Sequence, residues 1–164
     1  MRLIRYLIVW MLPGLLVLHP DHASAINNYR SRLLPQALEN AKQNNLSGAL
    51  YPWTSARFGN CTGTGPCADY EYHLNTDIAL VNWHQFLTTG DEDWLEKQGW
   101  PIIKGVAEMW ASRVGVSNET GDDGLLPGMY VVRNMTDPVS VSLSTLLQRW
   151  LTGGWYAGRI CESC

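Results

Sequence analysis

Helical periodicity interrupted by proline and glycine is the feature that most limits how this chain can fold. Apolar side chains recur every three or four residues in several segments, which is typical of a helix with one buried face. Proline stands at or near the start of several segments, where its missing N–H costs little. The expected helices cover residues 10–18, 20–33, 35–44, 76–87, 91–98 and 101–113.

Single residues predict where some of these helices begin and end. Thr76 or Asp77 is expected to cap the helix over residues 76–87, because its side chain can accept a hydrogen bond from a free N–H group of the first turn. Gly99 is expected to end one helix, and Pro101 to open the next. The helix over residues 35–44 is expected to be exposed.

Long polar segments separate the expected helices. Residues 44–69 are rich in glycine and lack periodicity, and residues 118–124 form a second polar loop. Residues 129–133 are a short strand candidate. No repeat of fixed period occurs. The pattern predicts an all-α fold of helical hairpins, either a bundle or an α/α toroid, and argues against a Rossmann fold or a β-sandwich.

Size and charge limit the possible partners. With 164 residues the chain is long enough for one domain with a real core. The net charge is −3 and 16% of residues are charged, so the composition has no basic footprint of the kind that nucleic acids require. The oligomeric state cannot be predicted from this composition.

The first 25 residues have two interpretations. Arg2 and Arg5 followed by an apolar stretch over residues 6–18 and by Ala-Ser-Ala at 23–25 resemble a signal peptide. The same stretch is equally typical of a buried helix. It is too short to span a membrane.

Four cysteines and four glycosylation sequons point to a secretory route. Cys61 and Cys67 flank a turn-rich insert that a disulfide could close. Cys161 and Cys164 form a C-x-x-C, but without the strand–helix setting of a redox motif. No second Cys or His pair stands at zinc-ligand spacing, so neither a metal nor another cofactor is predicted. The sequons begin at Asn45, Asn60, Asn118 and Asn134.

The segment from Tyr51 to Leu80 combines a Pro-Trp pair, an Arg, close cysteines and a Glu-Tyr-His sequence. This mixture is too polar for a core element and too rich in rings and carboxylates for a passive linker. Aromatic faces stack on the C–H faces of pyranoses, and charged groups bind their hydroxyls. The segment therefore predicts a carbohydrate site.

Several uncommon strings identify a family when they are taken in order. The chain from Trp10 to Pro138 resembles the fungal acid α,α-trehalases of glycoside hydrolase family 65, in the strings at residues 18–23, 28–42, 48–80, 89–114 and 134–138. The resemblance implies part of an (α/α)6 barrel, with residues 1–138 as a partial central catalytic domain and residues 139–164 as a tail outside the family. If residues 10–18 are a barrel helix, the buried-helix interpretation is favoured over the signal peptide.

The resemblance also implies the type of reaction, but this chain departs from the family pattern at the catalytic acid. Family hydrolases cleave α-glucosides with inversion, which requires one carboxyl group as acid and another, across the sugar, to activate water. The family acid is a Glu in a string like T-D-P-D-E-Y. After Pro138 this chain reads Val139-Ser140, and the base lies further on in the family. We therefore expect a trehalase fragment without hydrolysis, from either an unread splice donor or a short paralogue.

By resemblance, five residues form the sugar-binding wall: Trp53, Arg57, Glu71, His73 and Asp77. Structural alternatives exist for each. Trp53 could only stiffen its loop, Arg57 could pair with Glu71, His73 could be a buried imidazole, and Asp77 could cap a helix.

Two other functions stay open, a carbohydrate-binding remnant without catalysis and a glucosidase for another α-glucoside, such as glucosylgalactosylhydroxylysine. The resemblance implies an extracellular, cell-wall or vacuolar location.

Overall fold

The computed structural model describes residues 11–63, 67–68, 71–117, 128–132, 135 and 148–150. Most of the described residues are helical, so the all-α prediction is confirmed. The helices are α1 (Leu12–Leu18), α2 (Pro20–Arg32), α3 (Leu34–Gln43), α4 (His73–Thr89), α5 (Glu92–Trp94), the π-helical turn η2 (Leu95–Gly99) and α6 (Trp100–Arg113). The strands are β1 (Gly115–Val116), β2 (Tyr130–Val132) and β3 (Gln148–Trp150).

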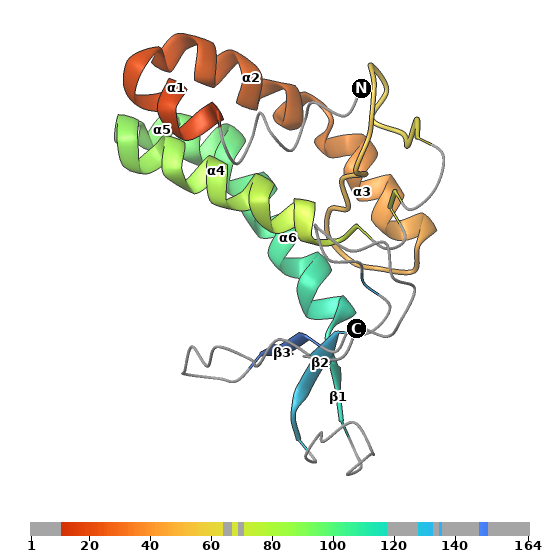
Figure 1. The fold of residues 1–164 in the computed structure, drawn as a ribbon. Helices are drawn as coiled ribbons and strands as arrows, with labels where there is room; N and C mark the ends of the chain where they lie inside the picture. The colour runs from red at the N-terminus through yellow and green to blue at the C-terminus, as the bar shows by residue number, and fades with distance from the viewer. Residues whose placement is uncertain are drawn as a thin grey trace, which may run out of the picture.

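Helix α4 is the centre of the helical part. It packs on α1 and α2 on one side and on α6 on another, while α3 contacts α2 and α6. Figure 1 shows α1 and α2 above α4, and the small sheet at the far end of α6. That sheet is antiparallel in the order β1-β2-β3. The predicted strand at 129–133 is confirmed as β2, whereas β1 and β3 were not expected.

The apolar run after residue 10 forms a helix that contributes to the core. Leu12 and Leu16 of α1 are buried, and they belong to a cluster that also contains Ala23, Ile78 and Ile102. Burying a leucine side chain contributes roughly 1.5–3 kcal/mol, so α1 is held by packing rather than by its own helix propensity.

Helix α3 is not the exposed helix that the sequence predicts. Ala37, Asn40 and Ala41 lie on one buried face, although the remaining face is open to solvent. The N–H of Leu50 donates to the carbonyl of Ala37 at 2.9 Å, because the following loop folds back over the helix. A loop that returns in this way cannot be read from the periodicity of residues 35–44 alone.

The expected start of α4 is wrong by about one turn. The helix begins at His73 after Tyr72, so Thr76 and Asp77 lie inside it and neither caps it. Leu74 is completely buried, and its packing extends the helix toward the N-terminus. Local cap preferences were outweighed by the core contacts of the preceding turn.

Gly99 does not end a helix, which corrects a second prediction. The Trp100 N–H donates to the carbonyl of Leu95, and the chain continues through η2 into α6. A Cβ atom on Gly99 would stand 2.8 Å from Cζ3 of Trp94, so the glycine makes room for an indole ring. The predicted start at Asp91 is confirmed, because its side chain accepts from the Trp94 N–H at 2.9 Å.

Candidate functional site

The loop that follows α3 is attached to two helices at its first residues. The N–H of Ala49 donates to the carbonyl of Gly105 in α6 at 2.8 Å, and Leu50 is bonded to α3 as described above. Gly48, with φ +72°, allows this close approach: a Cβ atom there would lie 2.1 Å from the Gly105 oxygen. The loop therefore has a defined path across the helices before it reaches Trp53.

Two buried asparagines hold the same loop from opposite sides. Asn40 of α3 donates from Nδ2 to the carbonyls of Leu50 and Gly59, each at 3.2 Å. Asn75 of α4 accepts the N–H of Tyr51 on Oδ1 at 2.7 Å. Because both amides are buried, these bonds are shielded from competing water and define the loop geometry.

Three of the predicted wall residues lie together. The ring of Trp53 stands 5.5 Å from the ring of His73, centroid to centroid, at an interplanar angle of 57°. An oxygen of Glu71 lies 3.5 Å from Nδ1 of His73. The two side chains are only 13% (His73) and 18% (Glu71) exposed. An aromatic face and a carboxylate–imidazole pair thus share one region at the start of α4.

The segment that carries Glu71 and His73 is not extended. Tyr72 has helical dihedral angles, and His73 is the first residue of α4. Asp77 follows His73 by four positions, so both are on one face of the helix, and Asp77 is partly buried. His73 and Asp77 therefore lie on the same face of the first turns of α4, and Glu71 lies two residues before the helix begins.

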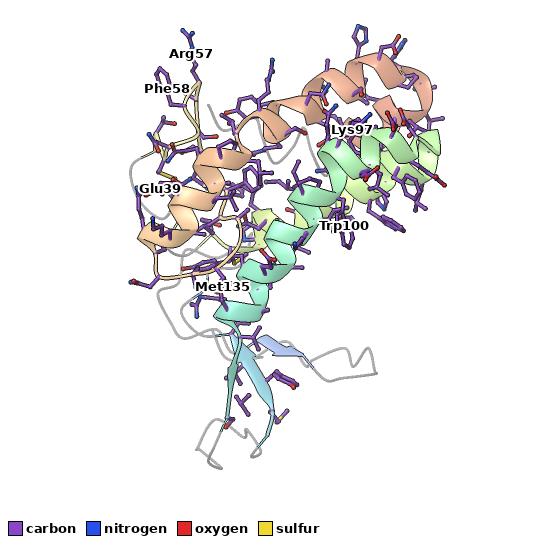
Figure 2. The ribbon with its side chains drawn as sticks, turned by 180° about the vertical axis from the view of Figure 1, so that it is seen from behind. Glu39, Arg57, Phe58, Lys97, Trp100 and Met135 are labelled. Carbon is purple, nitrogen blue, oxygen red and sulfur yellow. A yellow bond between two sulfur atoms is a disulfide. The ribbon has the colours of Figure 1, made fainter. Side chains whose placement is uncertain are left out.

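Arg57 lies at a different place from these residues. It is exposed, and its guanidinium stands 5.7 Å from the ring of Phe58, which is itself 73% exposed. Figure 2 shows both side chains projecting outward at the tip of the loop. The hydroxyl of Tyr29 donates to the Ala56 carbonyl at 3.0 Å and anchors the base of that tip.

The loop carries a disulfide and an exposed sequon. Cys61 and Cys67 are bonded with an S–S distance of 2.04 Å. The N–H of Trp53 donates to the Cys67 carbonyl at 3.1 Å, which joins the disulfide loop to the wall. Asn45 and Asn60 are exposed. The other predicted sites, Asn118, Asn134, Cys161 and Cys164, lie outside the described residues.

Helix α2 carries a buried cation that the sequence did not predict. Arg30 is 2% exposed, and its guanidinium is 5.5 Å from the Tyr29 ring and 5.6 Å from the Tyr51 ring. Within the described part of the chain, none of its three side-chain nitrogens has a hydrogen-bond partner. Burial lowers the pKa of Arg30 to about 10 and raises the pKa of Tyr51 above its ordinary value.

Neither a metal cluster nor a membrane-spanning helix is present in the described residues. No group of three or more His, Cys, Asp or Glu side chains is placed there to hold a metal ion. In the same residues, no helix is both long and apolar enough to cross a membrane.

Most of the chain matches the model of a known protein family. The model of the glycosyl hydrolase family 65 central catalytic domain matches residues 8–138. The chain belongs to glycosyl hydrolase family 65. The wall residues and the loop that carries them all lie inside the matched region.

Three curated relatives illustrate the range of this family. The chain is 45% identical over 133 residues to a periplasmic/secreted acid trehalase of Candida glabrata, covering 79% of this chain and 10% of that protein. It is 44% identical over 131 residues to a cell wall acid trehalase of Candida albicans, covering 79% and 12%. It is 39% identical over 129 residues to a kojibiose hydrolase of Mucilaginibacter mallensis, covering 77% and 18%. The chain thus spans about a tenth of the length of these trehalases.

Proposed function

We propose that this chain forms the sugar-binding wall of a family 65 catalytic domain and that its ligand is α,α-trehalose. The observation that carries the proposal is the grouping of Trp53, His73 and Glu71 within one family-matched region. An indole face beside polar groups fits a pyranose, whose C–H face stacks on the ring while its hydroxyls bind at the edge.

Each residue has a definite role in this proposal. Trp53 stacks on a glucose ring, and the Glu71–His73 pair binds hydroxyl groups at its edge. Asp77 accepts a further hydroxyl from the same helix face. Arg57, at the exposed loop tip, contacts the part of a ligand that extends beyond the wall.

We further propose that these 164 residues bind the sugar without cleaving it. Inverting hydrolysis needs an acid and a base on opposite sides of the bond. Glu71 is already paired with His73, and the family string with the catalytic acid is replaced after Pro138 by Val139 and Ser140. The retained function is therefore recognition of the disaccharide within a glycosidase framework.

The proposed location is the secretory route, ending outside the cell, in the cell wall or in the vacuole. The disulfide between Cys61 and Cys67 requires an oxidising compartment, and the exposed Asn45 and Asn60 are accessible for glycosylation. The names of the two trehalase relatives agree with this location.

A second candidate function is recognition of another α-glucoside. The similarity to a kojibiose hydrolase favours it, because both the matched region and the identity are comparable to those of the trehalases. Kojibiose and trehalose each contain two glucose units, one of which the wall would bind, and they differ in the linkage between the two units.

Calorimetric titration of the purified chain with trehalose, kojibiose and maltose tests the proposal, together with an assay for glucose release. We expect binding of trehalose in preference to the other two sugars, and no glucose. Preference for kojibiose would select the second candidate. Release of glucose from trehalose would contradict binding without cleavage, and absence of binding to all three sugars would contradict the wall itself.

A further inference from the structure

Asn75 is a completely buried amide that uses both ends of its side chain. Its Oδ1 accepts the N–H of Tyr51 at 2.7 Å, and its Nδ2 donates to the carbonyl of Tyr72 at 3.1 Å. A carboxylate can accept but not donate, and an aliphatic side chain can do neither. An amide of this size is therefore matched to both partners at once.

The two partners of Asn75 belong to the two segments that build the wall. Tyr51 precedes Pro52 and Trp53 in the loop, while Tyr72 lies between Glu71 and His73. The other loop contacts described above attach Ala49 to α6 and Leu50 to α3. The bond from Asn75 attaches the loop to α4, directly beside the residue pair that faces the indole.

We propose that Asn75 is a positioning residue that sets the spacing between Trp53 and His73, and with it the affinity of the wall for a sugar ring. This inference rests on the proposed sugar-binding function. If the Tyr51 N–H loses its acceptor, the buried backbone must find another partner, and the loop moves away from α4. Displacements of about 1 Å are sufficient to lose a well-placed binding contact.

The ring pair supplies a readout that does not depend on a ligand. A protonated imidazole quenches the fluorescence of an indole in contact with it. The Trp53 signal is the difference between the parent chain and Trp53→Phe, recorded while the solution is acidified from about pH 8 to 5. In the parent, we expect this difference signal to fall as the pH decreases, because His73 lies 5.5 Å away.

The decisive variants are Asn75→Leu and Asn75→Asp, with Asn82→Leu as the matched control. Asn82 is also fully buried in α4, but its side chain bonds to Ile78 and Asn27 rather than to the loop. We expect Asn75→Leu to lose the pH-dependent quenching and to bind trehalose at least about tenfold more weakly. Asn75→Asp keeps the acceptor for Tyr51 and should fall between the parent and Asn75→Leu. Asn82→Leu should keep both signals.

The outcomes separate this inference from the proposed function. Normal quenching in folded Asn75→Leu would overturn the inference, and so would equal losses in Asn75→Leu and Asn82→Leu. If Asn75→Leu does not fold by circular dichroism, Asn75→Asp decides by the same readouts. If the parent shows quenching that depends on Asn75 but does not bind trehalose, the sugar-binding function fails while the positioning role stands.

Discussion

The indole ring of Trp53 and the imidazole ring of His73 lie 5.5 Å apart, although they come from a loop and from the first turn of a distant helix. Tyr51, Asn75 and Tyr72 connect the two segments by buried hydrogen bonds. The candidate site therefore forms only when the loop and the helix pack together, and each of its residues can be tested by substitution.

Replacement of Trp53 by alanine should remove most of the trehalose affinity. Loss of a stacked indole face removes about 1–2 kcal/mol of contact, which corresponds to roughly five- to thirtyfold weaker binding. Titration calorimetry measures the change. The control is Trp100→Ala, because Trp100 is 52% exposed and is the first residue of α6 (Figure 2). Equal affinity in both variants would exclude stacking on Trp53.

Gly48→Ala should destabilise the fold far more than Gly90→Ala. Both glycines have positive φ, +72° and +65° respectively, so each alanine carries a backbone penalty of about 1 kcal/mol. Only at Gly48 would the added Cβ also collide with backbone, 2.1 Å from the Gly105 oxygen, whereas nothing lies within 4 Å at Gly90. Urea unfolding should show a loss of more than about 3 kcal/mol for Gly48→Ala. Similar losses for the two variants would contradict the close approach of the loop to α6.

Arg30 and Tyr51 should have opposite effects on stability at high pH. Burial lowers the pKa of Arg30 on folding to about 10, so the unfolded chain binds its proton more tightly and stability rises with pH above about 10. The pKa of Tyr51 rises from 10.0, so the unfolded chain loses that proton first and stability falls over the same range. Each group contributes a slope of up to about 1.4 kcal/mol per pH unit.

Two variants separate these opposing slopes. Arg30→Met removes the rising contribution, so its stability should fall more steeply with pH than that of the parent. Tyr51→Phe removes the falling contribution, so its stability should fall less or rise. Urea unfolding from about pH 9 to 11 measures the slopes. A change of slope in the same direction in both variants would show that burial does not shift these groups as described.

The outer face of α4 should limit the solubility of the isolated chain. Leu80, Trp83 and Leu87 are 48%, 43% and 61% exposed, at helical spacing, so they form an apolar stripe open to water. Leu80→Gln with Leu87→Gln should raise the soluble yield and change the free energy of unfolding by less than about 0.5 kcal/mol. Leu74→Gln, at a fully buried position of the same helix, should instead prevent folding. A loss of stability in the double variant would show that the stripe is packed.

The order of the helices could be predicted from the chain alone. Apolar spacing placed α1, α2 and α6 close to their observed bounds, and a helix begins at Asp91 as expected, with the Asp91 side chain as its cap. These features depend on neighbours within one or two turns, which a sequence shows directly. The uncommon strings between Trp10 and Pro138 identified the family, because side-chain types in order are themselves sequence information.

Contacts between distant segments decided the rest. Core packing of Leu74 moved the start of α4 ahead of Asp77, and the indole of Trp94 required Gly99 inside a continuous helix. The tertiary structure also grouped Trp53 with His73 and set Arg57 at an exposed tip. Asn75 carried no signal in the sequence, because an asparagine near a helix start is ordinary until its buried partner is known. Local preferences amount to a few tenths of a kcal/mol per residue, whereas burial and buried hydrogen bonds amount to one or more, so packing prevails where the two disagree.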